Sequence, residues 1–370
     1  MIPSYRALVD SGCEVFVAGR SPSEPLAKIC PRYLEVDYSD VDKVEALISA
    51  YSIDCLVPGC TDLSYQVCSQ IGMGRFSGID TPEVTKCIHN KESFREMALN
   101  LGLSVPKLLE KSEINEDTKV IVKPVDGFSG HGISIVNSSD SSSLASACAH
   151  AESVSGSKRC MIEEYIQGQL FSHSAFLRGG EIVADFIVRE DSVIDAFAVD
   201  TSCLEYNFDP QIRDHLRADV LKLHEHLQLV DGLVHTQFIL NNSGYWIIEV
   251  TRRCPGDLYS MLIEVSTGYA YGASYIDPFI GGHANRPVSG EHERRIIRHT
   301  VSSREPQTYL GLRFLRPLLI EHFAPIVSVG EFIGSGVEGR VGILFINADT
   351  ADSFEEIYAS LLNSNLYHIS

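Results

Sequence analysis

The sequence predicts an α/β protein in three parts: a doubly wound parallel-sheet domain, then α+β lobes, then a small α/β cap. Short apolar runs alternate with helical patterns near the N-terminus, which is typical of a parallel sheet with crossover helices. In the middle of the chain, pairs of β-like runs are joined by turn-forming residues, which predicts antiparallel hairpins. A strand pattern and a helix pattern, at residues 339–345 and 350–362, predict the cap. We place the domains at residues 1–88, 89–285 and 286–370, with a flap lobe at about 115–165.

The N-terminal part carries the alternation of strands and helices. Helix patterns cover residues 3–11, 40–50 and 62–71, and strand patterns cover residues 14–18, 34–36 and 54–58. No Gly-x-Gly-x-x-Gly motif follows any of these strands. The sequence therefore argues against a dinucleotide-binding domain, although the fold class is the same.

Two consecutive helices are predicted next, and the second begins with an unusual residue. Thr81 and Pro82 form a typical helix start, and Asn90 caps a further helix that Gly102 ends. Lys91 lies in the first turn of this helix, where the positive end of the helix dipole repels a cation. Lys91 is thus either an ordinary surface lysine or a residue that binds an anion together with the helix end.

A glycine-rich hairpin is predicted at residues 119–136. Its first strand ends at Lys123, and the loop that follows contains Gly127, Ser129, Gly130, His131 and Gly132. Such a loop can bring backbone N–H groups close to phosphate oxygens, because glycine has no side chain that prevents a close approach. The Gly-Lys-Ser/Thr signature of a P-loop is absent, and a plain glycine-rich hairpin is the alternative interpretation. His131 is expected at the tip of this flap rather than in catalysis.

Further strands and a long helix are predicted between this hairpin and a second one. The strand at residues 160–166 contains the run Glu163-Glu164-Tyr165-Ile166. More strands are predicted at residues 171–177, 181–188 and 192–198, and helices at residues 213–229 and 257–266.

The second hairpin presents polar side chains at its end. Its first strand carries Gln237, and its second strand runs through Glu249 and Thr251 to Arg253 after an Asn-Asn-Ser-Gly turn. In such a hairpin Gln237 and Glu249 face the same way from neighbouring strands and offer oxygen ligands to a hard cation. Arg253 lies just beyond, where it can neutralise a developing phosphate charge. The alternative is a hairpin with a solvated, charged tip.

The composition argues against several classes of function. The formal net charge of −19 disfavours a nucleic-acid or anionic-membrane surface, and no apolar run is long enough to span a membrane. The first residues lack a signal-peptide pattern, and the 10 cysteines form no Cys-x-x-Cys pair. We therefore expect a cytoplasmic protein with free cysteines and no zinc site. The basic cluster at residues 294–298 is interpreted as structural.

Four features stand in an order that resembles the ATP-grasp superfamily, which includes biotin carboxylase, D-alanine–D-alanine ligase and the L-amino-acid ligases. The features are Asn90-Lys91, the Lys123 strand with its glycine loop, residues 163–166, and the hairpin with Gln237 and Glu249-x-Thr251-x-Arg253. The likeness covers most of the chain. It implies that residues 1–88 form the pre-ATP-grasp domain, that residues 89–285 form the ATP-grasp domain, and that ATP lies between two α+β lobes.

The resemblance also implies a role for each candidate residue. Lys91 and Lys123 would contact the phosphates of ATP, and the glycine loop would close over them. Residues 163–166 would meet the adenine edge through their backbone. The resemblance further implies that Mg²⁺, or Mn²⁺ in its place, would be held by Gln237, Glu249 and Thr251, and that the transferred phosphoryl group would be stabilised by Arg253.

The implied activity is the ADP-forming ligation of a small carboxylate, most plausibly an amino acid, to an amine. Phosphorylation turns an oxygen of the carboxylate into a leaving group, and the amine can then attack. The implied partners are therefore a small-molecule carboxylate and an amine, with no nucleic acid and no membrane. Arg189, Arg252 and Arg298 are candidates for binding the carboxylate. A homodimer is the default assembly.

The chain departs from the family pattern at three positions. Gln237 replaces the usual Glu, and Thr251 replaces the usual Asn. Leu170 stands where the family has an acidic or polar ribose-binding residue, which leaves Ser172 or His173 as substitutes. With Glu249 as the only carboxylate in the hairpin, either the metal affinity is lower or ATP itself supplies most of the metal ligands. The alternative function is therefore a catalytically impaired ATP-binding or scaffold protein on the same fold, and a bicarbonate-using carboxylase ranks last.

Overall fold

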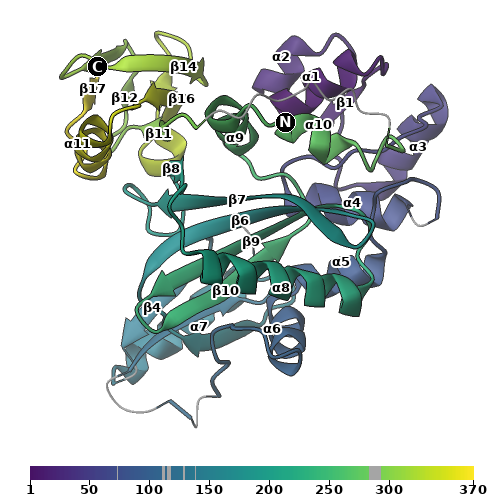
Figure 1. Ribbon diagram of the computed structural model, residues 1–370, viewed down its shortest axis with the longest axis horizontal. Coiled ribbons are helices and arrows are strands. Elements are labelled where there is room, and N and C mark those ends of the chain that lie inside the picture. The colour runs from purple at the N-terminus through teal and green to yellow at the C-terminus, as the bar shows by residue number, and fades with distance from the viewer. Residues whose placement is uncertain (73, 111–112, 115–117, 128–129, 138, 283–292) are drawn as a thin grey trace.

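The computed structural model describes residues 1–72, 74–110, 113–114, 118–127, 130–137, 139–282 and 293–370. Within these ranges the largest sheet has eight strands in the order β10-β9-β6-β7-β8-β11-β16-β14, and every neighbouring pair is antiparallel (Figure 1). Its strands are β6 (Gln169–Arg178), β7 (Glu181–Asp191), β8 (Thr201–Leu204), β9 (Gly232–Asn241), β10 (Gly244–Thr251), β11 (Ile296–Ser302), β14 (Leu319–Pro325) and β16 (Arg340–Asn347).

The N-terminal part contains a smaller parallel sheet than the sequence predicts. Its elements are α1 (Ile2–Asp10), β1 (Val17–Gly19), α2 (Pro25–Ile29), β2 (Tyr33–Glu35), α3 (Val41–Tyr51) and α4 (Asp62–Gly72). Strands β1 and β2 pair in parallel, and no further strand joins them among the described residues.

The strand predicted at residues 54–58 is therefore wrong. Leu56 packs against the apolar cluster of α3 and α4, and Val57 packs against the cluster that contains α9 and α10. An apolar run indicates burial, and these side chains are covered without any ladder of backbone hydrogen bonds.

Helices α5 (Pro82–His89) and α6 (Lys91–Asn100) begin where their capping residues predict. The side chain of Thr81 accepts a hydrogen bond from the Val84 amide, and Asn90 Oδ1 accepts one from the Ser93 amide at 2.9 Å. Each cap satisfies a backbone donor that the first helical turn leaves without a partner. Lys91 is consequently held at the N-terminus of α6.

The glycine-rich hairpin forms a separate three-stranded sheet. Its elements are β3 (Lys119–Pro124), β4 (Ser134–Asn137), α7 (Ser141–Val154) and β5 (Cys160–Glu164), and the strand order is β4-β3-β5. Both pairings of β3 are antiparallel, and α7 covers the sheet through an apolar cluster that includes Val120, Val122, Ala151 and Ile162. The predicted hairpin of the flap lobe is confirmed.

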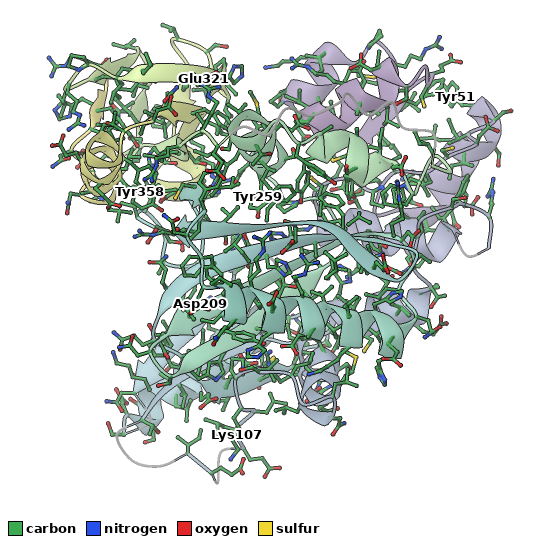
Figure 2. All side chains as sticks on the ribbon, in the orientation of Figure 1. Tyr51, Lys107, Asp209, Tyr259, Glu321 and Tyr358 are labelled. Atoms are coloured by element: carbon green, nitrogen blue, oxygen red, sulfur yellow. The ribbon has the colours of Figure 1, made fainter. Side chains whose placement is uncertain are left out.

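Different helices cover the two faces of the large sheet (Figure 1). The helices are α8 (Pro210–Leu227) on one side, and α9 (Tyr259–Thr267) and α10 (Tyr271–Ile276) on the other. Along β6, Phe171 and Ala175 join the apolar cluster with α8. Ser172 and Ser174 point the other way, and both hydroxyls lie within 3.3 Å of the hydroxyl of Tyr259, which is labelled in Figure 2. We call the α9 side, which carries these serines beside the apolar contacts of α9 and α10, the polar face.

The strand predicted at residues 192–198 is also wrong. The Asp200 carboxylate accepts hydrogen bonds from the Val193 and Ile194 amides at 2.8 and 3.0 Å, and Asp195 Oδ1 accepts one from the Phe197 amide. Side-chain acceptors of this kind compete with a strand ladder and fold the chain into turns. The strand that follows β7 in the sheet is β8 instead.

The C-terminal part adds three strands to the large sheet and one helix. Its further elements are β12 (Gln307–Thr308), β13 (Leu312–Phe314), β15 (Phe332–Ile333), η1 (Gly336–Gly339), α11 (Ala351–Leu362) and β17 (Tyr367–Ile369). Strands β11, β16 and β14 continue the sheet that begins in the hairpin β9–β10. The predicted cap is thus joined to the central lobe by the pairing of β11 with β8. The division of the chain at residue 286 stays a prediction.

Two expectations from composition can be compared with the structure. All ten cysteines lie within the described ranges, and all are free. Across the same ranges, no helix combines the length and the apolar character needed to cross a bilayer.

A buried histidine in β11 predicts a pH-dependent stability. His299 is nearly inaccessible, and burial followed by the charge of Arg298 lowers its pKa to about 3. This pKa lies below the ordinary value of about 6.5, so the unfolded chain binds the proton first as the pH falls. We expect His299 to reduce the free energy of unfolding by about 1.4 kcal/mol between pH 7.5 and pH 5.5. Denaturant titrations of the wild type and of His299→Gln at both pH values measure this difference, and equal pH dependence would contradict it.

Candidate active site

The hairpin of β9 and β10 places the predicted cation ligands side by side. Glu249 is directly opposite Gln237 in the antiparallel register, and Thr251 is opposite His235. The register shifts between Ile247 and Glu249, which brings the glutamate into line with Gln237. Both Gln237 and Glu249 are half-buried on the polar face of the sheet. The prediction that they face the same way is confirmed.

The end of this hairpin is attached to the N-terminal part of the chain by Asp62. Asp62 Oδ1 accepts hydrogen bonds from Thr251 Oγ1 at 3.1 Å and from Arg253 Nε at 3.0 Å, and His89 Nε2 lies 3.4 Å from the same oxygen. Burial alone would raise the pKa of Asp62, but His89 and Arg253 outweigh it and hold this pKa well below its usual range. Arg253 is therefore positioned by a carboxylate that the sequence analysis did not identify.

Lys91 and Glu249 line the same small pocket, together with Asp62, His89 and Arg95. The side-chain ammonium of Lys91 donates a hydrogen bond to the carbonyl oxygen of Gly127 in the glycine loop. The backbone amide of Lys91 donates to the Val125 carbonyl at 3.0 Å. The helix start, the glycine loop and the hairpin thus meet at one place. Three of the four features that the sequence analysis singled out converge there.

Lys123 is paired with Glu163 in the interior of the protein. Lys123 Nζ and Arg95 Nε both lie 2.6 Å from the Glu163 carboxylate, and Arg95 also donates to the Ile247 carbonyl at 2.8 Å. Burial lowers the pKa of Lys123, while Glu163 opposes this effect. Burial alone would raise the pKa of Glu163, but Lys123 and Arg95 keep it below its usual value. The side chain of Glu163 is therefore an anchor between the flap lobe, α6 and β10.

The glycine loop needs glycine at two described positions. Gly130 and Gly132 have φ angles of 73° and 77°, in the left-handed region that disfavours other residues. A Cβ at Gly130 would lie 2.6 Å from Cβ of Phe197, so the loop also packs tightly on the segment before β8. His131 is exposed, as expected for a flap tip. Ser129 lies outside the described residues.

The segment after β5 is less available than the resemblance implies. The Glu164 amide donates to the Lys107 carbonyl at 3.1 Å, and the Tyr165 amide donates to the Lys119 carbonyl at 3.3 Å. Glu164 Oε1 also accepts a hydrogen bond from the Lys107 amide. Tyr165 and Ile166 are half-buried beyond the end of β5. Their contact with adenine stays a prediction.

A buried glutamate that the sequence analysis missed lies beside Gln237. Glu190 in β7 accepts hydrogen bonds from Ser172 Oγ at 2.8 Å and from Gln237 Nε2 at 2.7 Å. Burial raises its pKa, and the nearby Glu249 adds to this, whereas Ser172, Gln237 and Arg298 oppose it. Nothing local marks Glu190, which lies two residues past the strand predicted at residues 181–188 and follows Arg189.

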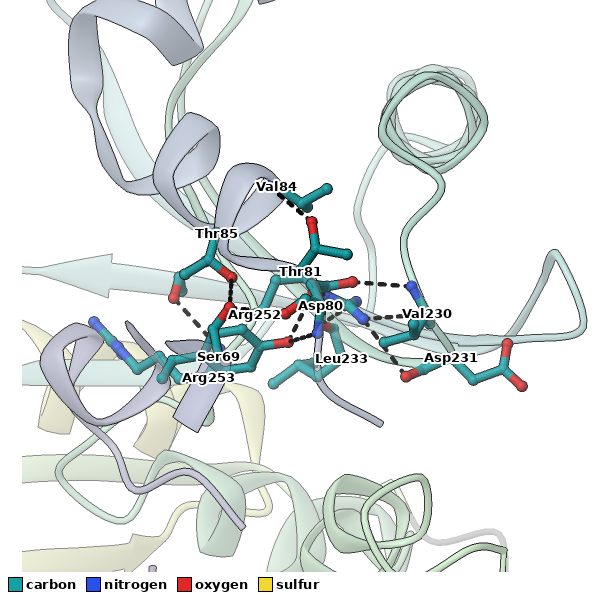
Figure 3. A network of polar contacts seen from close by, with 12 residues as sticks. Ser69, Asp80, Thr81, Val84, Thr85, Val230, Asp231, Leu233, Arg252 and Arg253 are labelled. Atoms are coloured by element: carbon teal, nitrogen blue, oxygen red, sulfur yellow. Dashed lines mark hydrogen bonds and ion pairs between the residues drawn. The ribbon is translucent and has the colours of Figure 1, made fainter. Parts of the chain in front are cut away.

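Two of the three candidate arginines are committed to other contacts. Arg252 forms a buried ion pair with Asp80, at 2.6 Å from Nε, and donates to the carbonyl oxygens of Val230 and Leu233 (Figure 3). Tyr65 reinforces the pair through a hydrogen bond to Asp80. The interpretation of Arg252 as a substrate-binding residue is therefore wrong, because its guanidinium already donates hydrogen bonds to acceptors inside the protein.

The other two arginines lie on either side of β8. Arg189 pairs with Asp191 at 3.1 Å and stacks over the ring of Tyr358. Arg298 donates to Ser202 Oγ at 2.8 Å and to the Asp257 carbonyl, and it lies on the polar face beyond Glu190. Arg298 alone remains next to the candidate site.

The suggested substitutes for a ribose-binding residue are both buried. Ser172 is fully inaccessible and bonded to Glu190 and Tyr259. His173 points to the opposite face, where its Nε2 lies 3.1 Å from Asp185. Neither side chain can reach a ribose from these positions, so the substitution suggested by the sequence analysis is wrong.

The donor atoms of the hairpin suit a hard divalent cation. Glu249 and Gln237 supply a carboxylate and an amide oxygen, which Mg²⁺ prefers over nitrogen or sulfur. Among the described residues no group of three or more His, Cys, Asp or Glu side chains could hold a metal ion. Thr251 is buried with its hydroxyl directed at Asp62. Ligands from a nucleotide would therefore have to complete such a site.

Residues 116–260 match the family model described as an ATP-grasp domain. The chain carries an ATP-grasp domain. The ATP-grasp match spans the flap lobe, strands β6 to β10 and the hairpin that holds Gln237 and Glu249. The resemblance inferred from the four ordered features is therefore confirmed.

Curated proteins and solved structures agree with the ATP-grasp match. The formate-dependent phosphoribosylglycinamide formyltransferase of Prochlorococcus marinus (strain MIT 9313) is 24% identical over 168 residues, which are 43% of each chain. The match thus spans less than half the length of this relative.

Three crystal structures cover nearly the whole chain. Phosphoribosylglycinamide synthetase from Anaerococcus prevotii has a TM-score of 0.75 at 15% identity and covers 100% of this chain and 96% of its own. The L-amino acid ligase from Bacillus licheniformis has a TM-score of 0.73 at 16% identity and covers 99% and 95%. The biotin carboxylase domain of the Hydrogenobacter thermophilus 2-oxoglutarate carboxylase, a dimer in complex with MgADP and bicarbonate, has a TM-score of 0.75 at 15% identity and covers 100% and 88%. At these identities the likeness establishes the fold.

Proposed function

We propose that this protein is an ATP-dependent, ADP-forming ligase that joins a small carboxylic acid, such as an amino acid, to an amine through an acyl-phosphate. The observation that carries the proposal is the pocket shared by Lys91 and Glu249, at which the glycine loop and the acidic hairpin also meet. A cation-bearing helix start facing a carboxylate across a pocket suits a metal–triphosphate, since it offers both signs of charge. The names of the similar proteins, which include an L-amino acid ligase and a phosphoribosylglycinamide synthetase, support this class of reaction.

The proposed roles are those that the family resemblance implies. Lys91 and Lys123 neutralise phosphate charge, and the loop with Gly127, Ser129, Gly130, His131 and Gly132 covers the phosphates. Residues Glu163, Glu164, Tyr165 and Ile166 border the adenine, while Glu163 also holds Lys123 in place. Gln237 and Glu249, with Thr251 next to them, would hold Mg²⁺ or Mn²⁺, which would neutralise phosphate charge.

The reaction proceeds in two balanced steps. A carboxylate oxygen attacks the γ-phosphorus, the bond between this phosphorus and the bridging oxygen breaks, and ADP leaves with the electron pair. The amine nitrogen then attacks the acyl carbon, the bond from that carbon to the phosphate oxygen breaks, and the nitrogen releases a proton. Arg253, held by Asp62, is placed to stabilise the negative charge of the transferred group.

A screen for ADP release tests this function. Pairs of amino acids and small carboxylic acids are incubated with ATP and Mg²⁺, and ADP is followed with a coupled assay. We expect at least one pair for which ADP release exceeds the rate with either substrate alone by about tenfold or more and stops when EDTA removes the cation. ADP release that is independent of both substrates across the whole panel would contradict the proposal.

One observation favours the alternative of a catalytically impaired ATP-binding or scaffold protein. The hairpin has Glu249 as its only carboxylate, and the hydroxyl of Thr251 is bonded to Asp62 inside the protein. This alternative predicts that ATP raises the melting temperature although no substrate pair yields product. The same screen, run beside thermal shift measurements, separates the two functions.

A further inference from the structure

Glu190 connects two strands that are not neighbours. Strand β6 lies between β7, which carries Glu190, and β9, which carries Gln237. Two strand spacings amount to about 10 Å. The two long side chains nevertheless meet, with Gln237 Nε2 at 2.7 Å from Glu190 Oε2.

The contact is possible because a small residue lies beneath it. Ser172 of β6 is directly opposite Gln237 and leaves room above the sheet for the longer side chains. Its hydroxyl donates to the other oxygen of Glu190 at 2.8 Å. Both oxygens of Glu190 are therefore bonded to protein donors, and Arg298 lies beyond Ser202 on the same face.

The contact determines which way the amide of Gln237 points. An amide offers one oxygen acceptor and one nitrogen donor, and the nitrogen of Gln237 is the atom that contacts Glu190. Glu190 therefore selects the orientation in which the nitrogen of Gln237 faces β7. The amide oxygen then points away from Glu190, and among the described residues no group donates a hydrogen bond to it.

This orientation matters because Gln237 stands opposite Glu249. A hard cation binds the amide oxygen and is repelled by the amide hydrogens, so the opposite orientation would block the site. We propose that Glu190 is a positioning residue that holds the amide oxygen of Gln237 toward the cation shared with Glu249. This inference rests on the proposed function, and it explains how the chain can use a glutamine at this place.

Glu190 acts on the cation through Gln237 and is not itself a ligand. A carboxylate at position 237 would need no orientation, since both of its oxygens accept. A glutamine needs a neighbour that accepts from its nitrogen, and Glu190 Oε2 does so at 2.7 Å.

The test compares ADP binding with and without Mg²⁺ at pH 8, by isothermal titration calorimetry. Glu190→Leu removes the acceptor, and we expect it to reduce the strengthening of ADP binding by Mg²⁺ by roughly tenfold to a hundredfold. ADP binding in EDTA should change by less than about twofold, because Glu190 is proposed to act on the cation alone. Glu181→Leu, an exposed glutamate on the same strand, is the matched control and should leave both values unchanged.

A double-mutant cycle separates positioning from direct ligation. If Glu190 acts through Gln237, Glu190→Leu has no further effect on the Mg²⁺ dependence in a Gln237→Leu background. A further loss in that background would overturn the proposal and assign Glu190 as a ligand itself. Glu190→Gln keeps the shape of the side chain but allows both amide orientations, and should give an intermediate loss that does not depend on a folding defect.

The outcomes also distinguish this inference from the proposed function. ADP binding that Mg²⁺ strengthens equally in the wild type and in Glu190→Leu would overturn the positioning role and leave the nucleotide site intact. Absence of ADP binding to the wild type, with and without Mg²⁺, would overturn the proposed function.

Discussion

Replacing Glu249 by alanine should lower kcat/KM for ADP formation by roughly a hundredfold to a thousandfold. Glu249 is the only carboxylate of the hairpin and lines the pocket that Lys91 shares. Without it the cation would keep the phosphate oxygens of the nucleotide, but its protein ligand would be the neutral amide oxygen of Gln237, which binds a divalent ion more weakly than a carboxylate. Initial rates at varied ATP and Mg²⁺ measure the effect, and part of the loss should return at high Mg²⁺.

The control for this experiment is an exposed glutamate away from the site. Glu225→Ala, on the solvent side of α8, removes the same side chain and should keep wild-type rates. A Glu249→Ala variant that is folded and turns over at the rate of Glu225→Ala would show that the hairpin is not the cation site.

Replacing Glu163 by glutamine should destabilise the protein by about 3–5 kcal/mol. Glu163 is fully inaccessible and accepts from both Lys123 and Arg95, so the variant leaves two buried cations without their counter-charge. The cost arises because a buried charge that loses its partner keeps the full penalty of desolvation. Denaturant titration at pH 7.5 measures the change in the free energy of unfolding.

The neighbouring Glu164 supplies a control with the same chemistry. Glu164→Gln can still accept the hydrogen bond from the Lys107 amide and lies half-exposed, so its cost should stay below about 1 kcal/mol. Equal destabilisation by both variants would mean that the buried triad contributes no more than an exposed carboxylate.

Much of the candidate site could be predicted from short stretches of sequence. The capping residues Thr81 and Asn90 place the starts of α5 and α6, and therefore Lys91. The pattern of the second hairpin sets Gln237 opposite Glu249, because alternation along paired strands decides which side chains share a face. These inferences hold because each depends on neighbours within a few residues or across one turn.

The errors arise from partners that a pattern of residue types does not show, some of them nearby in the sequence and others far away. The runs at residues 54–58 and 192–198 look like strands. The first is only partly buried and forms no ladder, and the second is folded into turns by Asp195 and Asp200. Arg252 was a candidate for binding a substrate, yet its guanidinium is paired with Asp80, which lies 172 residues away along the chain. A pattern of residue types indicates burial or charge but does not identify the partner.

The sequence by itself determined the order of the elements, the three features that meet at one pocket, and the family to which the central domain is similar. Only the tertiary structure decided which carboxylates support them: Asp62 for Arg253, Glu163 for Lys123 and Arg95, and Glu190 for Gln237. The physical reason is that a charge inside a protein must be matched by a partner within a few ångströms. With 49 acidic residues in the chain, the fold alone brings one of them to each place.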